Sequence, residues 1–272
     1  MKLNRTIAIL CLLILSVVTT FAQQKQPTFL QTIAVSSATA ISADRNNAVY
    51  FLNPRRNLVQ LDSLGKLVTV YSPQTLLGRA TTIDAGNPLK ILLFNPDRQE
   101  LLLLDRFLRP ISSALLPEFE ITETIRAAAL GSDDSFWLFN ETDLTLSKLD
   151  MRMRKIVFET PLSLVLDQTR FDVRMLREYQ NLVYMLDFNG GVYVFDNLGN
   201  YKQKLPITGV SYIGFLGNEL YFVKEGNLHF YGLYNQQQRT ISFPKDKNYT
   251  SALATKNRLY LFTRNATDVY SW

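Results

Sequence analysis

Five strand-like runs along the chain each end in a proline: TVYSP (69–73), SALLP (113–117), VFETP (157–161), KQKLP (202–206) and TISFP (240–244). Successive prolines are separated by 44, 44, 45 and 38 residues. Proline has no N–H to donate within a sheet, so it suits the position where a strand ends. A spacing near 40 residues that recurs along the chain indicates a repeat architecture.

Each unit also contains four consecutive apolar residues, many of them β-branched or aromatic: VYFL (49–52), ILLF (91–94), FWLF (136–139), VYML (183–186), LYFV (220–223) and LYLF (259–262). Continuous apolar runs of this length are typical of strands buried on both faces. A strand rich in Ala, Ser and Thr precedes each run, a third strand follows it, and a fourth leads to the proline. Four short strands per unit predict a β-propeller in which each apolar run is the second strand of a blade.

The two ends of the chain determine the number of blades. The sixth unit stops at Trp272 after its third strand, and a spare strand, FLQTIAV (29–35), precedes the first unit. We expect the spare strand to pair with the last strand and complete a sixth blade, which removes exposed sheet edges. The sequence therefore predicts an all-β, six-bladed propeller of four-stranded blades, closed by its N-terminal strand.

The first residues have the pattern of a secretory signal. Lys2 and Arg5 precede an apolar stretch over residues 7–18, and small residues follow it. The stretch is shorter than the roughly 20 residues of a membrane-spanning helix, although a retained anchor remains the alternative. We predict a signal peptide over 1–22 and a single propeller domain over 23–272.

Composition limits the classes of partner. The only cysteine, Cys11, lies in the predicted signal peptide, so the exported chain is expected to fold without a disulfide. Cleavage would lower the formal net charge from +5 to +3. The basic residues form no run, whereas a nucleic-acid-binding protein needs a concentrated basic patch. We predict no nucleic-acid partner and no membrane span after cleavage.

The turn after the third strand reads LDSLGK (61–66) and FDNLGN (195–200), with degenerate copies LDRFLR (104–109) and LDMRMR (149–154). This pattern resembles the strand–Asp–x–x–Gly–strand turn of NHL-type and gluconolactonase-like (TolB-like) six-bladed propellers, and the resemblance covers nearly all of residues 29–272. It implies the six-bladed fold. Gluconolactonase-like members hold a divalent cation in the central channel, so the resemblance also raises a metal-dependent lactonase or esterase as an alternative activity.

The carboxylates do not favour a metal site. The turn aspartates are expected to accept backbone N–H bonds, and they lie on different blades: Asp62, Asp105, Asp150 and Asp196. Hard cations take 6–8 oxygen ligands, whereas the innermost strands contain few carboxylates or amides. The single histidine, His229, falls in a third-strand pattern that offers no cleft. We predict no metal, no cofactor and no catalytic residues.

Two turns between second and third strands present arginines on the face where such propellers usually bind ligands. FLNPRRN (51–57) and LFNPDRQ (93–99) have Asn and Pro at the first two positions of a type I turn. Their arginines, Arg55, Arg56 and Arg98, suit a carboxylate or an acidic partner. The alternative is that they are ordinary solvated turn residues.

The innermost strands contain Arg126 and Arg174. Strand alternation directs about half of such side chains into the channel, where these arginines would line a polar tunnel. They would equally form ion pairs with Asp84 and Asp172, because charges inside a protein need partners.

Long connections between blades contain apolar residues. Leu76, Leu77, Phe119 and Leu164 lie in such loops and are candidates for a docking patch on one face. Alternatively, these side chains fill the mouth of the channel or pack as short helical turns.

These patterns favour an exported, non-catalytic binding or scaffold propeller of a Gram-negative cell envelope. We expect a monomer that resides in the periplasm or at the outer membrane, or is secreted, with an envelope or outer-membrane protein as its partner. Two alternatives stay open. One is the metal-dependent hydrolase with its site in the channel, and the other is a small-ligand or glycan binder that uses the arginine turns and the channel mouth.

Overall fold

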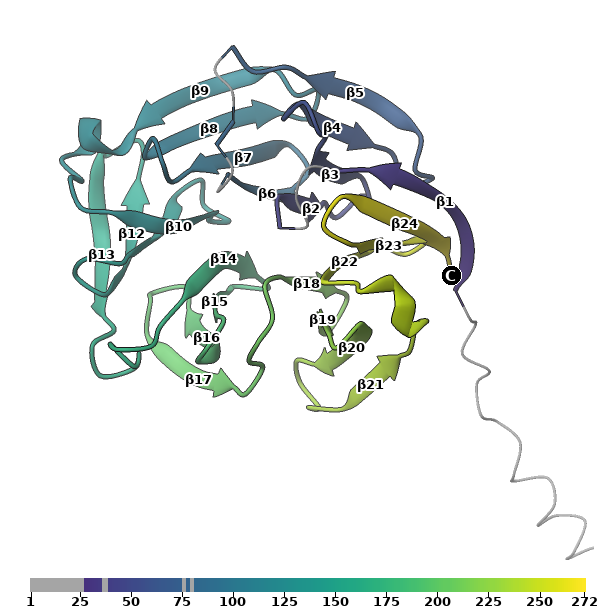
Figure 1. The fold of residues 1–272 in the computed structure, drawn as a ribbon. Helices are drawn as coiled ribbons and strands as arrows, with labels where there is room; N and C mark the ends of the chain where they lie inside the picture. The colour runs from purple at the N-terminus through teal and green to yellow at the C-terminus, as the bar shows by residue number, and fades with distance from the viewer. Residues whose placement is uncertain (1–26, 36–38, 75–76, 79–80) are drawn as a thin grey trace, which may run out of the picture.

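The computed structural model describes residues 27–35, 39–74, 77–78 and 81–272. In these residues 24 strands form six four-stranded antiparallel sheets, arranged as blades around a central channel (Figure 1). The predicted all-β, six-bladed propeller is therefore confirmed. The predicted signal peptide and Leu76 lie outside the described residues.

Strands run outward from the channel in chain order. Blade 1 contains β2 (Ile41–Ala43), β3 (Val49–Leu52), β4 (Leu58–Leu61) and β5 (Leu67–Tyr71). Blade 2 contains β6 (Thr82–Asn87), β7 (Lys90–Asn95), β8 (Glu100–Asp105) and β9 (Pro110–Leu115), followed by the 3-10 helix η1 (Leu116–Phe119). Blade 3 contains β10 (Ile125–Leu130), β11 (Phe136–Asn140), β12 (Thr145–Asp150) and β13 (Lys155–Pro161).

The remaining blades follow the same plan. Blade 4 contains β14 (Val173–Tyr179), β15 (Leu182–Asp187), β16 (Gly191–Asp196) and β17 (Tyr201–Leu205). Blade 5 contains β18 (Ile213–Leu216), β19 (Glu219–Lys224), β20 (Asn227–Gly232) and β21 (Gln238–Ile241), followed by the 3-10 helix η2 (Lys245–Lys247). Blade 6 contains β22 (Ser251–Ala254), β23 (Arg258–Phe262), β24 (Ala266–Ser271) and β1 (Thr28–Ala34).

The second strand of each blade forms the core, as its apolar run predicts. All four residues of β3 and all five of β11 are buried, including Trp137. These side chains pack between blades: one core cluster joins Trp137 of blade 3 to Met185 of blade 4. The hydrophobic effect therefore holds neighbouring blades together through both faces of their second strands.

The N-terminal strand closes the ring. In Figure 1, purple β1 lies beside yellow β24, and the two pair antiparallel from Thr28 opposite Ser271 to Ala34 opposite Ala266. The Thr32 hydroxyl donates to Asp268 Oδ1 at 2.6 Å across this pairing. The predicted closure of the last blade is confirmed.

The aspartate turns also form as predicted. Asp62 Oδ1 accepts the backbone N–H groups of Leu64 and Lys66 at 2.8 and 2.9 Å. Gly65 takes the positive φ of 78° that this turn needs, and Leu108 occupies the matching position of a degenerate copy at 60°. These carboxylates are turn-forming groups.

No helix among the described residues is both long enough and apolar enough to cross a membrane.

Candidate functional site

One face of the ring carries the connections between blades and the turns between second and third strands. We call it the loop face. The opposite face, which carries the first-to-second hairpins and the aspartate turns, is the turn face. Where the channel opens at the loop face there is a cavity of about 310 Å³, which we call the mouth cavity.

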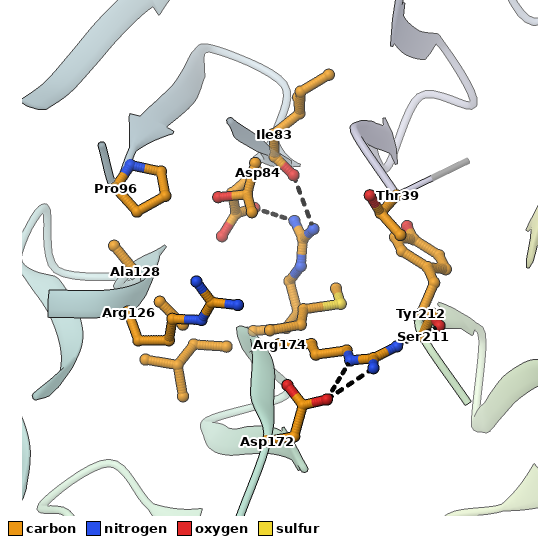
Figure 2. A pocket seen from close by; sticks show the side chains of 15 residues that line it. Thr39, Ile83, Asp84, Pro96, Arg126, Ala128, Asp172, Arg174, Ser211 and Tyr212 are labelled. Carbon is orange, nitrogen blue, oxygen red and sulfur yellow. Dashed lines mark hydrogen bonds and ion pairs between the residues drawn. The ribbon is translucent and has the colours of Figure 1, made fainter. Parts of the chain in front are cut away.

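The mouth cavity is built by the first strands of several blades and the segments that lead into them. Its lining comes from blades 1 to 5: Thr39, Thr82, Ile83, Asp84, Pro96, Arg126, Ala127, Ala128, Asp172, Arg174, Met175, Leu176, Arg177, Ser211 and Tyr212. Figure 2 shows the polar groups of this set directed toward one another across the channel. The only charged residues in it are three arginines and two aspartates.

A buried ion pair forms the floor of the cavity. Arg177 of β14 contacts Asp84 of β6, and the exposed fractions of their side chains are 8% and 7%. Arg177 also donates to the carbonyl oxygen of Ile83 at 3.1 Å, and Asp84 Oδ2 accepts the N–H of Leu130 at 3.1 Å. A buried ion pair needs such additional hydrogen bonds to satisfy its remaining polar atoms. The pair joins blades 2, 3 and 4 across the channel.

A second cavity of about 190 Å³ opens at the turn face, and Arg177 and Tyr212 line both cavities. These side chains therefore interrupt the channel between its two ends. Burial raises the pKa of Tyr212 to about 12, so its hydroxyl stays protonated and available as a donor.

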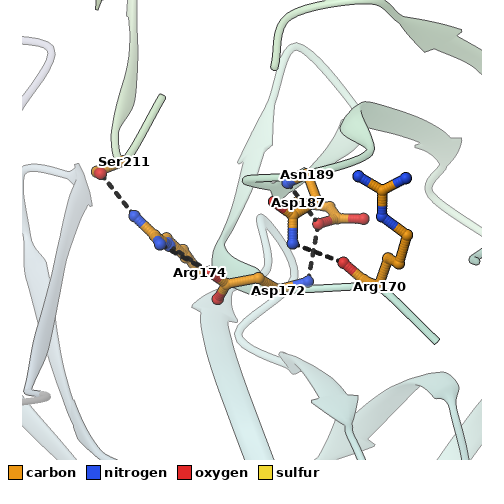
Figure 3. Close-up of polar contacts among 6 residues, drawn as sticks. All are labelled: Arg170, Asp172, Arg174, Asp187, Asn189 and Ser211. Atoms are coloured by element: carbon orange, nitrogen blue, oxygen red, sulfur yellow. Dashed lines mark hydrogen bonds and ion pairs between the residues drawn. The ribbon is translucent and has the colours of Figure 1, made fainter. Parts of the chain in front are cut away.

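The second aspartate is held by Arg174. The guanidinium of Arg174 donates to Asp172 Oδ2 from two nitrogens, at 3.0 and 2.6 Å, and to Ser211 Oγ of the next blade at 2.7 Å (Figure 3). Buried Asp187 fixes the start of this strand because its Oδ1 accepts the backbone N–H of Asp172 at 2.8 Å. The predicted pairing of Arg174 with Asp172 is thus observed.

Arg126 differs from the other two arginines. Its side chain is exposed and points from β10 into the mouth cavity (Figure 2). Asp84 pairs with Arg177, so Arg126 does not form the ion pair that was left open for it as an alternative. Within the described part of the chain, Arg126 has no ion pair or hydrogen bond through its guanidinium.

The arginines of the turns do not form one cluster. Arg55 is exposed at its turn, whereas Arg56 Nε donates to the carbonyl oxygen of Leu77 at 3.0 Å and ties the turn to a blade connection. Arg98 pairs with Glu100 at 2.9 Å beside a separate groove of about 490 Å³ between blades 1 and 2. A common role for the three in binding a partner stays a prediction.

The proposed apolar docking patch is mostly buried. Leu77 and Phe119 are 8% and 7% exposed, because each packs into a hydrophobic core cluster of neighbouring strands. Leu164 alone among the described candidates is on the surface, with 99% of its side chain exposed. The connections therefore pack inward and leave one apolar side chain projecting.

Sequence reasoning missed Arg177. Arg177 lies within β14, the first strand of blade 4, which ends at Tyr179. The signal was an arginine directly after the apolar pair of Met175 and Leu176, within a strand that faces the channel. His229, by contrast, lies where it was expected, in β20, where Nδ1 is 3.0 Å from Thr240 Oγ1.

The described residues contain no group of three or more His, Cys, Asp or Glu side chains arranged to hold a metal ion. In the mouth cavity both carboxylates are bound by arginines. Among the described residues that line it, the charged groups are therefore two ion pairs and one cation without an ion-pair partner, Arg126.

No family model matches the sequence, and no curated protein matches it. The likeness to known proteins is structural. The virginiamycin B lyase of Staphylococcus aureus superposes with a TM-score of 0.57 and 9% identity, over 89% of this chain and 98% of the lyase. BamB from Moraxella catarrhalis matches with a TM-score of 0.48 and 11% identity, over 90% of this chain and 100% of BamB.

PorZ, a bacterial surface component of the type-IX secretion system of Porphyromonas gingivalis, matches with a TM-score of 0.56 and 15% identity. The match covers 86% of this chain and 30% of PorZ. At these identities the comparisons establish the fold. The chain has the six-bladed propeller fold that its resemblance to the NHL-type and gluconolactonase-like (TolB-like) propellers implied.

Proposed function

We propose that the protein is an exported, non-catalytic binding propeller of a Gram-negative cell envelope, and that its loop face engages an envelope or outer-membrane protein. The observation that carries this proposal is the charge arrangement of the mouth cavity. Among the described residues of the cavity, Asp84 and Asp172 are both ion-paired, and Arg126 is the charged group without an ion-pair partner. An exposed guanidinium without a partner suits the binding of an anionic group.

The position of the single histidine supports a non-catalytic role. A variant of the S. aureus lyase in which one histidine is replaced by alanine is catalytically inactive. In this chain His229 stacks on Phe222 with ring centroids 5.3 Å apart, on the third strand of blade 5 and outside the residues that line the mouth cavity. A general acid or base must be within reach of its substrate, and this position offers no such reach.

Two further observations support the envelope and the protein partner. PorZ, a surface component of a bacterial secretion system, contains a region of the same fold. On the loop face of this chain, Leu164 projects fully into solvent. A large apolar side chain at this position suits a contact with another protein. The signal-peptide pattern at residues 1–22 supports export.

Site-specific photo-cross-linking tests the proposal. A photoreactive amino acid is placed at Leu164 on the loop face, and in a matched variant at Leu198, a 53% exposed leucine of an aspartate turn on the turn face. Both full-length chains are expressed in the native host, and intact cells are irradiated. We expect Leu164, but not Leu198, to yield a discrete adduct with an envelope or outer-membrane protein. Equal labelling from the two faces, or no adduct from Leu164, would contradict the proposal.

A further inference from the structure

We infer that the mouth cavity binds one carboxylate group on Arg126. This inference rests on the proposed binding function of the loop face and adds the chemistry of what it binds. Arg126 projects into the cavity from β10, and its guanidinium has no partner among the described residues (Figure 2).

The charge of the cavity selects the charge of the ligand. Among the described residues, three arginines and two aspartates line it, which leaves one positive charge in excess within this set. Arg177 is neutralised by Asp84, and Arg174 by Asp172. A ligand with a single negative charge therefore balances the site. A phosphate dianion would leave an excess negative charge beside the two aspartates, where like charges repel.

The geometry of a guanidinium suits a carboxylate. Its planar fork of N–H groups forms two parallel hydrogen bonds with the two carboxylate oxygens. Ser211 and Tyr212 line the same cavity on the side opposite Arg126 (Figure 2), where Ser211 Oγ already accepts a hydrogen bond from Arg174. The Tyr212 hydroxyl makes no hydrogen bond to another described residue, so it is available to donate to the ligand.

Size limits the rest of the ligand. The cavity of about 310 Å³ is at the lower end of the range for small-molecule sites, which is about 300–1,000 Å³. The Asp84–Arg177 pair closes it below. It therefore holds a small organic acid, or one acidic residue that a partner protein inserts, but not a long ligand that passes through the channel.

The test follows the side-chain Nε–H resonance of Arg126 by NMR in the exported full-length chain. The first probe is sodium acetate, titrated against sodium chloride at constant ionic strength. We expect a saturable shift at Arg126 with acetate only. Arg126→Gln lacks this resonance, so acetate binding to it is followed through the backbone amide of Ala127, which also lines the cavity, and should be about tenfold or more weaker, the usual effect of losing a charge-assisted hydrogen bond. Arg106→Gln is the matched control, because Arg106 is exposed in an aspartate turn on the turn face.

A second pair of probes identifies the source of the carboxylate. These are the blocked tripeptide Ala-Ala-Asp, with both termini capped, and its Asn twin. Tighter binding of the Asp peptide than of acetate, with no binding of the Asn twin, would assign the carboxylate to a protein partner. Acetate binding without peptide binding would assign it to a free small acid. Either result supports the carboxylate site.

Two results would overturn the inference. One is the absence of any shift at Arg126 with acetate and with the Asp peptide, and the other is tighter binding of inorganic phosphate than of acetate at pH 8. Acetate affinity should also fall below about pH 4–5, where a carboxyl group becomes protonated. If Leu164 cross-links to an envelope protein while no carboxylate binds, the binding function stands and the ligand assignment fails.

Discussion

A buried ion pair between Arg177 and Asp84 lies at the centre of this propeller. Arg177 and Asp84 are both buried, and each has further hydrogen bonds to the backbone of β6 and β10. Gly86 permits this arrangement, because a Cβ at that position would lie 3.3 Å from Asp84 Oδ1. Removal of one partner would leave the other charge buried without compensation, which is far more costly than removal of both.

We therefore predict that Arg177→Met lowers the free energy of unfolding by about 3–5 kcal/mol. The double variant Arg177→Met/Asp84→Asn should recover more than half of this loss, because no uncompensated charge remains. Urea titrations followed by circular dichroism measure both. Arg174→Met is the control, because the Arg174–Asp172 ion pair is about one-third exposed and should contribute about 1 kcal/mol or less to the free energy of unfolding. Equal losses for the Arg177 and Arg174 variants would contradict the central role of the buried pair.

A second residue-scale prediction concerns acid. Burial alone would raise the pKa of Asp133, but the hydrogen bonds from Lys148 and Ser135 outweigh burial and lower it to about 2 from its ordinary 3.8. A carboxyl group with a lowered pKa in the folded state stabilises the fold above its unfolded pKa, and this contribution is lost as the pH falls through the folded value. The loss should therefore occur between about pH 4 and pH 2.

The measurement is the unfolding midpoint of the native chain and of Asp133→Asn at several pH values from 5 to 2. The difference in unfolding midpoint between the native chain and Asp133→Asn should be constant above about pH 4 and shrink below it. In a Lys148→Met background the same substitution should show much less pH dependence, because Lys148 Nζ, 2.8 Å from Asp133 Oδ2, is the charge that lowers the pKa. If the difference in unfolding midpoint grew toward acid pH, the predicted direction of the Asp133 pKa shift would be wrong.

At the scale of the strand, the sequence predicted the positions of the strands more completely than it predicted the contacts of the mouth cavity. The run VYFL coincides with β3, and the spare N-terminal strand pairs with β24, because burial on both faces imposes a local pattern that is visible in the sequence. The mouth cavity is different. Its contacts join residues such as Arg177 and Asp84, which are 93 positions apart, and no local pattern shows which arginine meets which aspartate. The burial of Phe119 likewise depends on a core cluster that joins it to strands of blades 2 and 3.

The closing strand provides a test at this scale. Thr32 of β1 donates to Asp268 of β24 at 2.6 Å, and Tyr249 donates to the other oxygen of the same carboxylate at 2.6 Å. Thr32→Val keeps the shape of the side chain but removes one donor. We expect a loss of about 1–2 kcal/mol in the free energy of unfolding, as for an exposed hydroxyl that donates to a buried charged group.

Thr69→Val is the matched control, because Thr69 lies on β5, the fourth strand of blade 1, which pairs within a single continuous segment of chain. Chemical denaturation of both variants gives the comparison. If Thr32→Val costs no more than Thr69→Val, the hydroxyl does not contribute to closure.

At the scale of the whole molecule, β1 joins the first part of the chain to the last. The ring is closed where β1 pairs with β24 and fills the outer position of blade 6. Loss of this strand exposes the edge of β24 and removes a contact that no local element replaces. The consequence should therefore extend beyond blade 6, because each blade is held by its neighbours.

We predict that a chain that begins at residue 35 unfolds at least about 10 °C below one that begins at residue 23 and aggregates more readily, since about 2.5–5 kcal/mol or more is lost from a domain of this size. A synthetic peptide with the sequence of residues 27–35 should restore part of the melting temperature in a concentration-dependent manner, because it binds the folded state. A peptide with the same composition in scrambled order is the control. Full stability of the truncated chain, or equal rescue by both peptides, would contradict closure by β1, because re-pairing with β24 requires the register of Thr28 opposite Ser271.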